Sequence, residues 1–381
     1  MAAIEFRLPK GAILFSADGF SYEFRENLGE AHHGLSHLLV RKRTAEGHPR
    51  ESVLLKAVGP PSGPGGRRVY KARARLEEQV RLAQFLQHPA ILRTYGLHKV
   101  EGTWYMLTEN PVGPSLNEHL ALVQECRRWF SPLFTLYVGA QVAAALAHAH
   151  TAKDESGKPL GIVHRAIDLE NVFVDWNGKV QVSDFGTALS KLRGRVASSV
   201  RRPRGDIYFG SPEMLLGARV DGRSDLFTLG LVMLELSTGK NLLYSPDGVT
   251  PERMARLSDK ELRQVDRAIL RAHLAGYDDS TLVEILHQVA TYTPEDVDAA
   301  TEALPDVLRM PLRKLLQRSP DARYQTAGEL EAELRASLGD TFGTEEAAAE
   351  VMEIVRETDK LMEEIDIPGT RRRSVYEVTT R

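Results

Sequence analysis

The chain changes its hydrophobic pattern near residue 110, and this change limits the folds that it can adopt. Before that point, branched and aromatic residues alternate with polar ones, which is typical of strands. Three such runs, Tyr22–Leu28, Leu38–Lys42 and Ser52–Val58, follow one another in hairpin order. After residue 110 the pattern turns mainly helical, beginning with the Ala-rich segment Pro132–His150. The sequence therefore predicts an α+β fold whose first part is a sheet and whose second part is mainly helical.

The β-rich part is expected to contain one helix. Val69–Gln87 carries apolar residues at helical spacing, and His88-Pro89 stops the pattern. Two further strands fit Leu92–Leu97 and Tyr105–Glu109. The first ~110 residues are thus predicted to form a five-stranded sheet with one helix.

The second part ends in two predicted helices. One opens at Thr326 with Glu329 three positions later, which is a capping-box pattern, and runs to Leu338. The other is expected to be capped by Thr344, and its apolar stripe predicts that it docks on the same chain. That stripe consists of Val351, Ile354, Val355, Leu361, Met362 and Ile365. The final segment, Pro368–Arg381, is polar and predicted to be disordered.

Composition argues against several classes of protein. The 381 residues carry a formal net charge of −3, so no overall basic field attracts nucleic acid. The single cysteine, Cys126, excludes an internal disulfide and fits a reducing cytoplasm. Residues 1–11 do not have the pattern of a signal peptide, and no run approaches the ~20 apolar residues of a membrane span. We expect a cytoplasmic protein without a membrane span; the sequence gives no oligomeric state.

Two motifs with a fixed spacing point to a family. The segment Gly161–Asn171 contains His164-Arg165-Ala166 and ends in Asn171, and thirteen residues later comes Asp184-Phe185-Gly186. These segments resemble the catalytic loop H-R-D-x-x-x-x-N and the D-F-G motif of protein kinases. The chain is most similar to bacterial Ser/Thr kinases of the eukaryotic type. The resemblance implies a two-lobed kinase-like fold and a role in signalling.

Further motifs extend the resemblance over residues 22–338. Ser211-Pro212-Glu213 is similar to A-P-E, Ser224-Asp225-Leu226 to the start of the central helix, and Arg323 to the late arginine that pairs with the A-P-E glutamate. The implied domains are an N-terminal extension at 1–21, an N-lobe at about 22–110, a C-lobe at about 111–338, and a tail at 339–381. The resemblance at these positions implies a buried Glu213–Arg323 pair and an Asp225 that anchors the catalytic loop.

The resemblance also implies ATP and Mg²⁺ as cofactors. Lys56 resembles the third-strand lysine that contacts the α- and β-phosphates. Asp184 and Asn171 would each bind Mg²⁺, whose preferred ligands are oxygens. Protein partners or a protein substrate are implied as well.

The nucleotide-binding positions are partly altered. Leu28–Gly34 resembles the Gly-rich loop, with Gly29 and Gly34 retained and Ala31 in place of the middle glycine. Thr108 matches the gatekeeper, and the segment that begins at Glu109 matches the hinge that reads adenine. We expect weakened ATP binding, because the methyl group of Ala31 hinders the approach of backbone to phosphate.

The glutamate that pairs with the third-strand lysine is also replaced. The family's spacing places Gln79 there, and a one-residue shift would present Glu78 instead. Gln79 is expected to hydrogen-bond Lys56 without offsetting its charge.

The largest departure lies in the catalytic loop. Ala166 stands where the family has the aspartate that accepts the substrate's proton, and losing a general base typically costs 10²–10⁴-fold in rate. Asp168 stands where a lysine normally neutralises the γ-phosphate, and its charge would repel that phosphate. Alternatively, Asp168 could serve as a substitute base.

The segment between D-F-G and S-P-E is basic and surrounds Ser198 and Ser199. Together with Arg165 it could grip a phosphoserine or an acidic partner, or it could be a solvated loop. Ser374, after Arg371-Arg372-Arg373, resembles a substrate site of basophilic kinases.

Three functions stay open. The first is a pseudokinase that binds nucleotide weakly and acts as a scaffold or allosteric regulator. The second is a low-rate Ser/Thr protein kinase. The third, a small-molecule phosphotransferase, is disfavoured by Ser211-Pro212-Glu213 and Arg323, which such enzymes usually lack.

Overall fold

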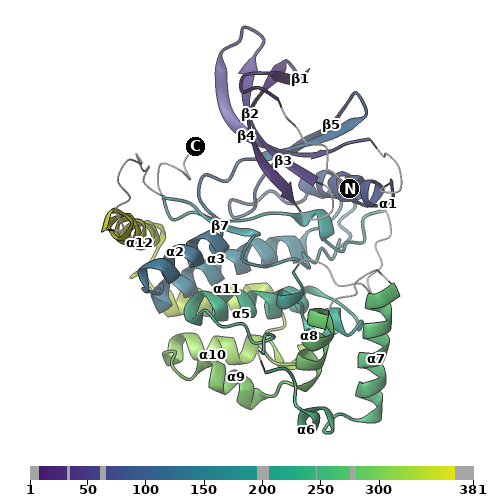
Figure 1. Ribbon diagram of the computed structural model, residues 1–381, viewed down its shortest axis with the longest axis vertical. Helices are drawn as coiled ribbons and strands as arrows, with labels where there is room; N and C mark the ends of the chain where they lie inside the picture. Colours follow the sequence, from purple (N-terminus) through teal and green to yellow (C-terminus); the bar gives the residue numbers. More distant parts are fainter. Residues whose placement is uncertain are drawn as a thin grey trace. The chain divides into compact units, whose positions relative to one another are not determined.

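A computed structural model describes residues 8–31, 35–60, 66–194, 206–245, 247–274 and 280–364 (Figure 1). The chain divides into two compact units, which are described separately below. Residues up to Pro111 form the first unit together with the short stretch Asp184–Gly186, and most of the chain from Val112 onward forms the second.

The first unit is built on one antiparallel sheet of six strands in the order β1-β2-β3-β4-β6-β5. The strands are β1 Ile13–Ala17, β2 Phe20–Ala31, β3 Leu35–Thr44, β4 Pro49–Val58, β5 Thr94–Val100 and β6 Thr103–Glu109. The predicted count of five strands is wrong, because a sixth strand, β1, lies within residues 1–21, for which the sequence predicts only an N-terminal extension. The signal was present in the sequence: Asp18-Gly19 forms the two-residue turn between β1 and β2, and both residues have positive φ.

The two faces of this sheet bury different sets of side chains. One face packs Phe15 and Tyr22 with strand residues such as Leu38 and Leu55. The other face packs Leu35, Val58 and Met106 against Ala72 and Leu76 of α1, which spans Gly66–Ala83. Along β4, residues alternate between the faces, so Lys56 lies on the same side of the sheet as Val58 and α1.

The second unit is mainly helical, as expected, and its core helices are α3, α5 and α11 (Figure 1). Its helices are α2 Leu116–Cys126, α3 Pro132–Thr151, α4 Pro212–Leu215, α5 Gly222–Thr238, α6 Pro251–Met254, α7 Asp259–Leu274, α8 Ser280–Thr291, α9 Pro294–Thr301, α10 Asp306–Leu315, α11 Ala327–Leu338 and α12 Thr344–Glu364. Of the described helices, α3 alone is long and apolar enough to cross a membrane, and 72% of its apolar window is buried inside the fold.

A short hairpin joins the catalytic-loop segment to the D-F-G segment. Its strands are β7 Val172–Val174 and β8 Val180–Val182, and they pair antiparallel. An Asn-Gly pair is a typical signal of a hairpin turn, and Asn177-Gly178 lies in this one: Gly178 has φ +79°, and Asp175 accepts hydrogen bonds from the amides of Asn177 and Lys179. Short 3-10 turns lie at Phe185–Thr187, Ile207–Phe209 and Pro320–Ala322.

The two predicted helix starts near the C-terminus have different outcomes. Thr326 does cap α11, since its hydroxyl accepts from the amide of Glu329, although the Glu329 carboxylate turns back to the amide of Gln325. Thr344 is not the cap of α12 but its first residue, because the carbonyl of Gly343 accepts the first helical bond. Residues 365–381, with the predicted disordered end and Ser374, lie outside the described residues.

Candidate functional site

Lys56 and Asp184 form an ion pair within the first unit. Lys56 extends from β4 and is buried, and its Nζ lies 3.3 Å from Oδ1 of Asp184. The backbone at Asp184 has φ +61°, a conformation that non-glycine residues rarely adopt outside functional or tightly turned segments. The pair therefore brings together the two residues for which the sequence analysis predicted phosphate binding and Mg²⁺ binding.

His37 is a residue of this site that the sequence analysis missed. It stands directly opposite Lys56 in the register of β3 and β4, so both side chains lie on the same face. Its Nε2 is buried and has no hydrogen-bond partner among the described residues. Burial, followed by the charge of Lys56, lowers the pKa of His37 to about 4, so the ring is neutral at pH 7. Only the pairing register of β3 and β4 places His37 opposite Lys56, and a single sequence does not reveal that register.

Gln79 lies on α1 but does not bind Lys56 as predicted. Its Nε2 donates to Oγ1 of Thr94 at 3.3 Å, and among the described residues it makes no hydrogen bond with Lys56. Glu78, the alternative, lies 3.5 Å from Arg81 on the same helix. The reason is geometric, because α1 directs the amide of Gln79 toward β5 while Asp184 takes the ammonium group of Lys56.

The residues assigned to adenine and phosphate binding are found on the strands of the sheet. Thr108 is buried in β6 and its hydroxyl donates to the carbonyl of Leu54 at 3.3 Å. The amide of Glu109 donates to the carbonyl of Arg93, so this first hinge amide is already used within the sheet. Gly29 has φ +104°, which only glycine adopts easily, and Ala31 ends β2. Gly34 lies outside the described residues.

The catalytic-loop segment belongs to the second unit, and Ala166 within it is buried. Asp168 is buried too, and it caps the turn that follows: Oδ1 accepts from the amides of Glu170 at 3.1 Å and Asn171 at 2.9 Å. Its Oδ2 accepts from Nδ2 of Asn171 at 3.0 Å. The carboxylate thus holds the loop's own backbone, as aspartates commonly do at turns.

Asn171 is held on three sides. Its Nδ2 also donates to the carbonyl of Ala166 at 3.1 Å, and its Oδ1 accepts from the hydroxyl of Ser183 at 3.3 Å. These contacts orient the amide with its oxygen away from Asp168, which suits a metal ligand. In the part of the chain that the structure describes, no three His, Cys, Asp or Glu side chains gather as a metal site. The carboxylate of Asp184 and the amide oxygen of Asn171 are each of a ligand type that Mg²⁺ accepts, since this ion typically takes few protein ligands and completes its shell with phosphates and water.

Asp225 of α5 anchors the loop backbone. Its carboxylate is fully buried and accepts from the amides of His164 and Arg165, each at 2.8 Å, and lies 2.8 Å from Nε2 of His150. His164 reaches the carbonyl of Ser183 through Nε2 at 2.7 Å. The anchoring role inferred for Asp225 is therefore observed.

Arg165 is directed inward. Its side chain is buried, and Nε and Nη2 both donate to the carbonyl of Thr187. This geometry does not support the predicted role of Arg165 in gripping a phosphoserine from the surface. Ser198, Ser199 and the basic residues from Arg195 to Arg204 lie outside the described residues.

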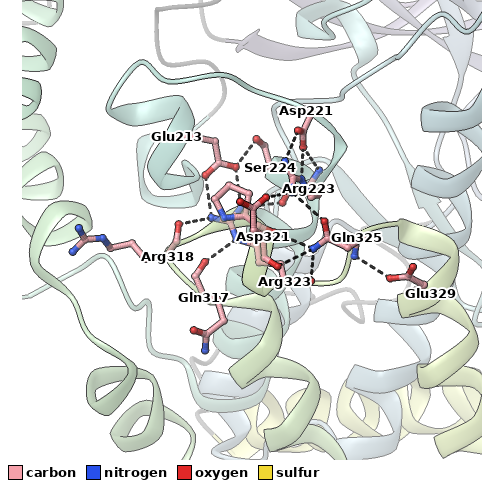
Figure 2. Close-up of polar contacts among 11 residues, drawn as sticks. Glu213, Asp221, Arg223, Ser224, Gln317, Arg318, Asp321, Arg323, Gln325 and Glu329 are labelled. Atoms are coloured by element: carbon pink, nitrogen blue, oxygen red, sulfur yellow. Dashed lines mark hydrogen bonds and ion pairs between the residues drawn. The ribbon is translucent and has the colours of Figure 1, made fainter. Parts of the chain in front are cut away.

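Figure 2 shows the buried pair of Glu213 and Arg323, which links α4 to the turn before α11. Two parallel contacts of 2.8 and 3.0 Å join the guanidinium to the carboxylate, and the hydroxyl of Ser224 donates to the same carboxylate at 2.6 Å. The guanidinium also donates to the carbonyls of Arg223, Gln317 and Arg318. Every charge in this pair is thus compensated by hydrogen bonds, which a buried ion pair needs to be tolerated.

Comparison with known proteins agrees with this geometry. Residues 66–327 match the family model described as protein kinase domain. The tyrosine-protein kinase MasK of Myxococcus xanthus is 30% identical over 252 residues, which are 64% of this chain and 36% of that protein. The serine/threonine-protein kinase PrkC of Bacillus subtilis is 32% identical over 168 residues, which are 44% of this chain and 24% of that protein.

A third relative extends further along the chain. The probable serine/threonine-protein kinase SCO3848 of Streptomyces coelicolor is 28% identical over 270 residues, which are 70% of this chain and 33% of that protein. In these three matches the aligned region spans about a third or less of the curated relative's own length.

Proposed function

Since the chain belongs to the protein kinase domain family and has that family's two-lobed α+β fold, we propose that it is a pseudokinase of the cytoplasm. It binds ATP with Mg²⁺ weakly, transfers phosphate slowly or not at all, and acts in signalling as a scaffold or allosteric regulator of protein partners. The observation that carries this proposal is the catalytic loop, in which Ala166 holds the base position and Asp168 caps its own turn.

Nucleotide binding is supported by the Lys56–Asp184 pair. Lys56 would contact the α- and β-phosphates, and Asp184 and Asn171 would hold Mg²⁺, which supplies charge neutralisation for the phosphates when bound. The altered Gly-rich loop, with Ala31, makes this binding weak.

Phosphoryl transfer would need a proton acceptor near the attacking hydroxyl. As the hydroxyl oxygen bonds to the γ-phosphorus and ADP leaves, the hydroxyl proton must go to a base. The methyl group of Ala166 accepts no proton. A missing base typically costs 10²–10⁴-fold in rate, equivalent to about 3–5 kcal/mol of barrier.

A second candidate is a slow Ser/Thr protein kinase that transfers the γ-phosphate of ATP to protein hydroxyls. The presence of Lys56, Asn171 and Asp184 favours it, with Asp168 as the substitute base. Against it, the Asp168 carboxylate accepts three hydrogen bonds from its own loop, and proton transfer would have to compete with them.

The test measures binding and transfer separately. Titration calorimetry with ADP, with and without Mg²⁺, is expected to show weak binding that improves with the metal and loses this improvement in Asp184→Ala. Labelled ATP with Mg²⁺ or Mn²⁺ and a generic basic protein should give no label above the Asp184→Ala control. Label above that control would overturn the pseudokinase proposal in favour of the slow kinase, and binding without metal dependence would overturn the assigned cofactor set.

A further inference from the structure

The tail helix α12 is docked on the second unit rather than projecting from it (Figure 1). One face of α12 packs on α2 and α3 and is fully buried. This face consists of Ala347, Val351, Ile354, Val355 and Thr358. Of the predicted stripe, Leu361 is exposed, while the side chain of Met362 and all of Ile365 lie outside the described residues.

An acidic flank fixes the orientation of α12. The guanidinium of Arg128 contacts Glu357 at 2.7 Å and Glu353 at 2.8 Å. One turn earlier, Glu350 accepts hydrogen bonds from the hydroxyl and the amide of Ser131. Ser131 is the N-cap of α3, so Glu350 brings a carboxylate to the positive end of the core helix. The contacts of α12 are thus specific in position and in charge.

The first turn of α12 is in close contact with the β7–β8 turn. The hydroxyl of Tyr137 donates to the carbonyl of Gly178 at 2.9 Å and lies 3.1 Å from the hydroxyl of Thr344. A Cβ atom added at Gly178 would lie 2.1 Å from the carbonyl oxygen of Thr344 and 2.9 Å from the amide of Ala348. No side chain fits at Gly178 unless α12 moves.

The same hairpin carries a candidate Mg²⁺ ligand at its other end. Asn171 directly precedes β7, and Ser183 directly follows β8. The amide of Ser183 donates to the carbonyl of Asn171 at 2.9 Å, and its hydroxyl donates to Oδ1 of Asn171. The hairpin is short and hydrogen-bonded, so a displacement of its turn would also displace the amide oxygen of Asn171 at its other end.

We propose that α12 is a positioning element for nucleotide binding: by holding the β7–β8 turn, it holds Asn171 where that residue binds Mg²⁺ with the nucleotide. The inference rests on the proposed function for its last step, but not for the mechanical link between α12 and the hairpin. It assigns the tail helix a role in the site itself, in addition to its contribution to stability.

Two glycines in matching turns allow a controlled test. Gly157 and Gly178 both have φ +79°, and each precedes a lysine whose amide donates to an aspartate four residues earlier, Asp154 or Asp175. Alanine at either position meets the same backbone strain. A Cβ at Gly157 meets nothing within 4 Å, so Gly157→Ala is the control for Gly178→Ala.

Three measurements are made on the full chain. Trypsin cleavage after Arg356 and Lys360 reports release of α12, and amide hydrogen exchange over 171–183 reports the hairpin without any nucleotide. The ratio of ADP affinities with and without Mg²⁺ reports whether Asn171 contributes to Mg²⁺ binding. For Gly178→Ala we expect faster cleavage, faster exchange and a loss of at least about tenfold in the Mg²⁺-dependent ratio, as for other residues that orient metal ligands. Gly157→Ala should stay within about twofold of the wild type.

Release of α12 with unchanged exchange at 171–183 would overturn the proposal, and so would equal changes in both variants or no change in either. If Gly178→Ala does not fold, Tyr137→Phe removes only the hydroxyl contact and should give smaller changes in the same direction. If the wild type does not bind ADP with Mg²⁺, the proposed function fails, while the exchange comparison still decides whether α12 holds the hairpin.

Discussion

The catalytic loop and the Glu213–Arg323 network belong to the same unit. The network keeps the glutamate and the arginine of the kinase pattern, whereas the loop departs from that pattern at two positions. Glu213 and Arg323 have every partner that the pattern implies, with two parallel contacts and a supporting hydroxyl. Asp225 likewise anchors the loop backbone. In the loop itself, Ala166 and Asp168 stand where the kinase pattern has an aspartate and a lysine.

Under the proposed function, the shape of this fold and its chemistry depend on different residues. Asp225 of α5 and Asp168 of the loop both accept hydrogen bonds from the loop backbone, so the loop keeps its conformation with alanine at position 166. The proposed function requires that phosphoryl transfer is lost while the kinase fold stays stable, and fold alone does not establish activity. The predictions below test this separation.

The largest expected effect follows from restoring the base. Ala166→Asp should raise the rate of phosphate transfer by about 10²–10⁴-fold over the wild type, because a carboxylate returns to the position that accepts the hydroxyl proton. Label transfer from ATP to a basic protein measures this rate. Ala166→Asn has nearly the same shape but accepts no proton, and it should stay at the wild-type level. Equal rates in the two variants would contradict the base assignment.

The scaffold should respond in the opposite way. Arg323→Ala should lower the free energy of unfolding by about 3–5 kcal/mol, because it leaves Glu213 buried without its cation. Denaturant unfolding followed by circular dichroism measures this. Arg335→Ala removes an exposed pair with Glu331 on α11 and should cost at most about 1 kcal/mol. A similar loss in the two variants would mean that the buried pair has no special structural role.

Much of this fold could be predicted because its signals are local and repeated. Strand alternation, helical spacing and the Asn177-Gly178 turn all predicted the observed elements, and the paired motifs placed Asn171 and Asp184 at the two ends of one hairpin. The strand β1 was not predicted, because it lies before residue 22, where the kinase resemblance begins, although Asp18-Gly19 marks its turn. Local signals sufficed where an element is defined by its own residues.

The site was predicted less completely because its side chains depend on distant partners. Gln79 was expected to meet Lys56, but the placement of α1 sends it to Thr94. His37 was overlooked, since only the β3–β4 register puts it opposite Lys56. For Asp168 the sequence predicted repulsion of a phosphate or a role as substitute base, and it did not reveal that the carboxylate caps its own turn. The one-dimensional sequence does not state which of several possible partners a side chain meets.

A buried histidine gives the second unit a pH dependence. His119 of α2 is buried, and burial lowers its pKa to about 4, below the ordinary value of 6.5. Between these values the unfolded chain binds a proton that the folded chain does not, so stability falls as pH falls from about 6.5 to 4. The difference amounts to about 3 kcal/mol over the window.

Urea unfolding from pH 7.5 to 4.5 measures this effect by comparison with His119→Gln. The Nε2 of His119 lies 2.9 Å from the carbonyl of Val174, and glutamine keeps a donor there without titrating in this range. The variant should lose less stability than the wild type as the pH falls. His48→Gln, at an exposed position, should leave the slope unchanged. A wild-type slope that persists in His119→Gln would assign the pH dependence to other groups.

The smallest effect concerns Asp168, which distinguishes the two open functions. If its carboxylate caps the turn, Asp168→Ala should lower the free energy of unfolding by about 0.5–2 kcal/mol, as for the loss of other side-chain caps. Any residual label transfer should then stay at the level of Asp184→Ala, because Asp168 takes no proton from the substrate. If Asp168 is instead a substitute base, the wild type should transfer label above that control, and Asp168→Ala should remove the excess by 10²-fold or more. The loop would then do both structural and chemical work through one carboxylate, and the separation between scaffold and chemistry would fail at this residue.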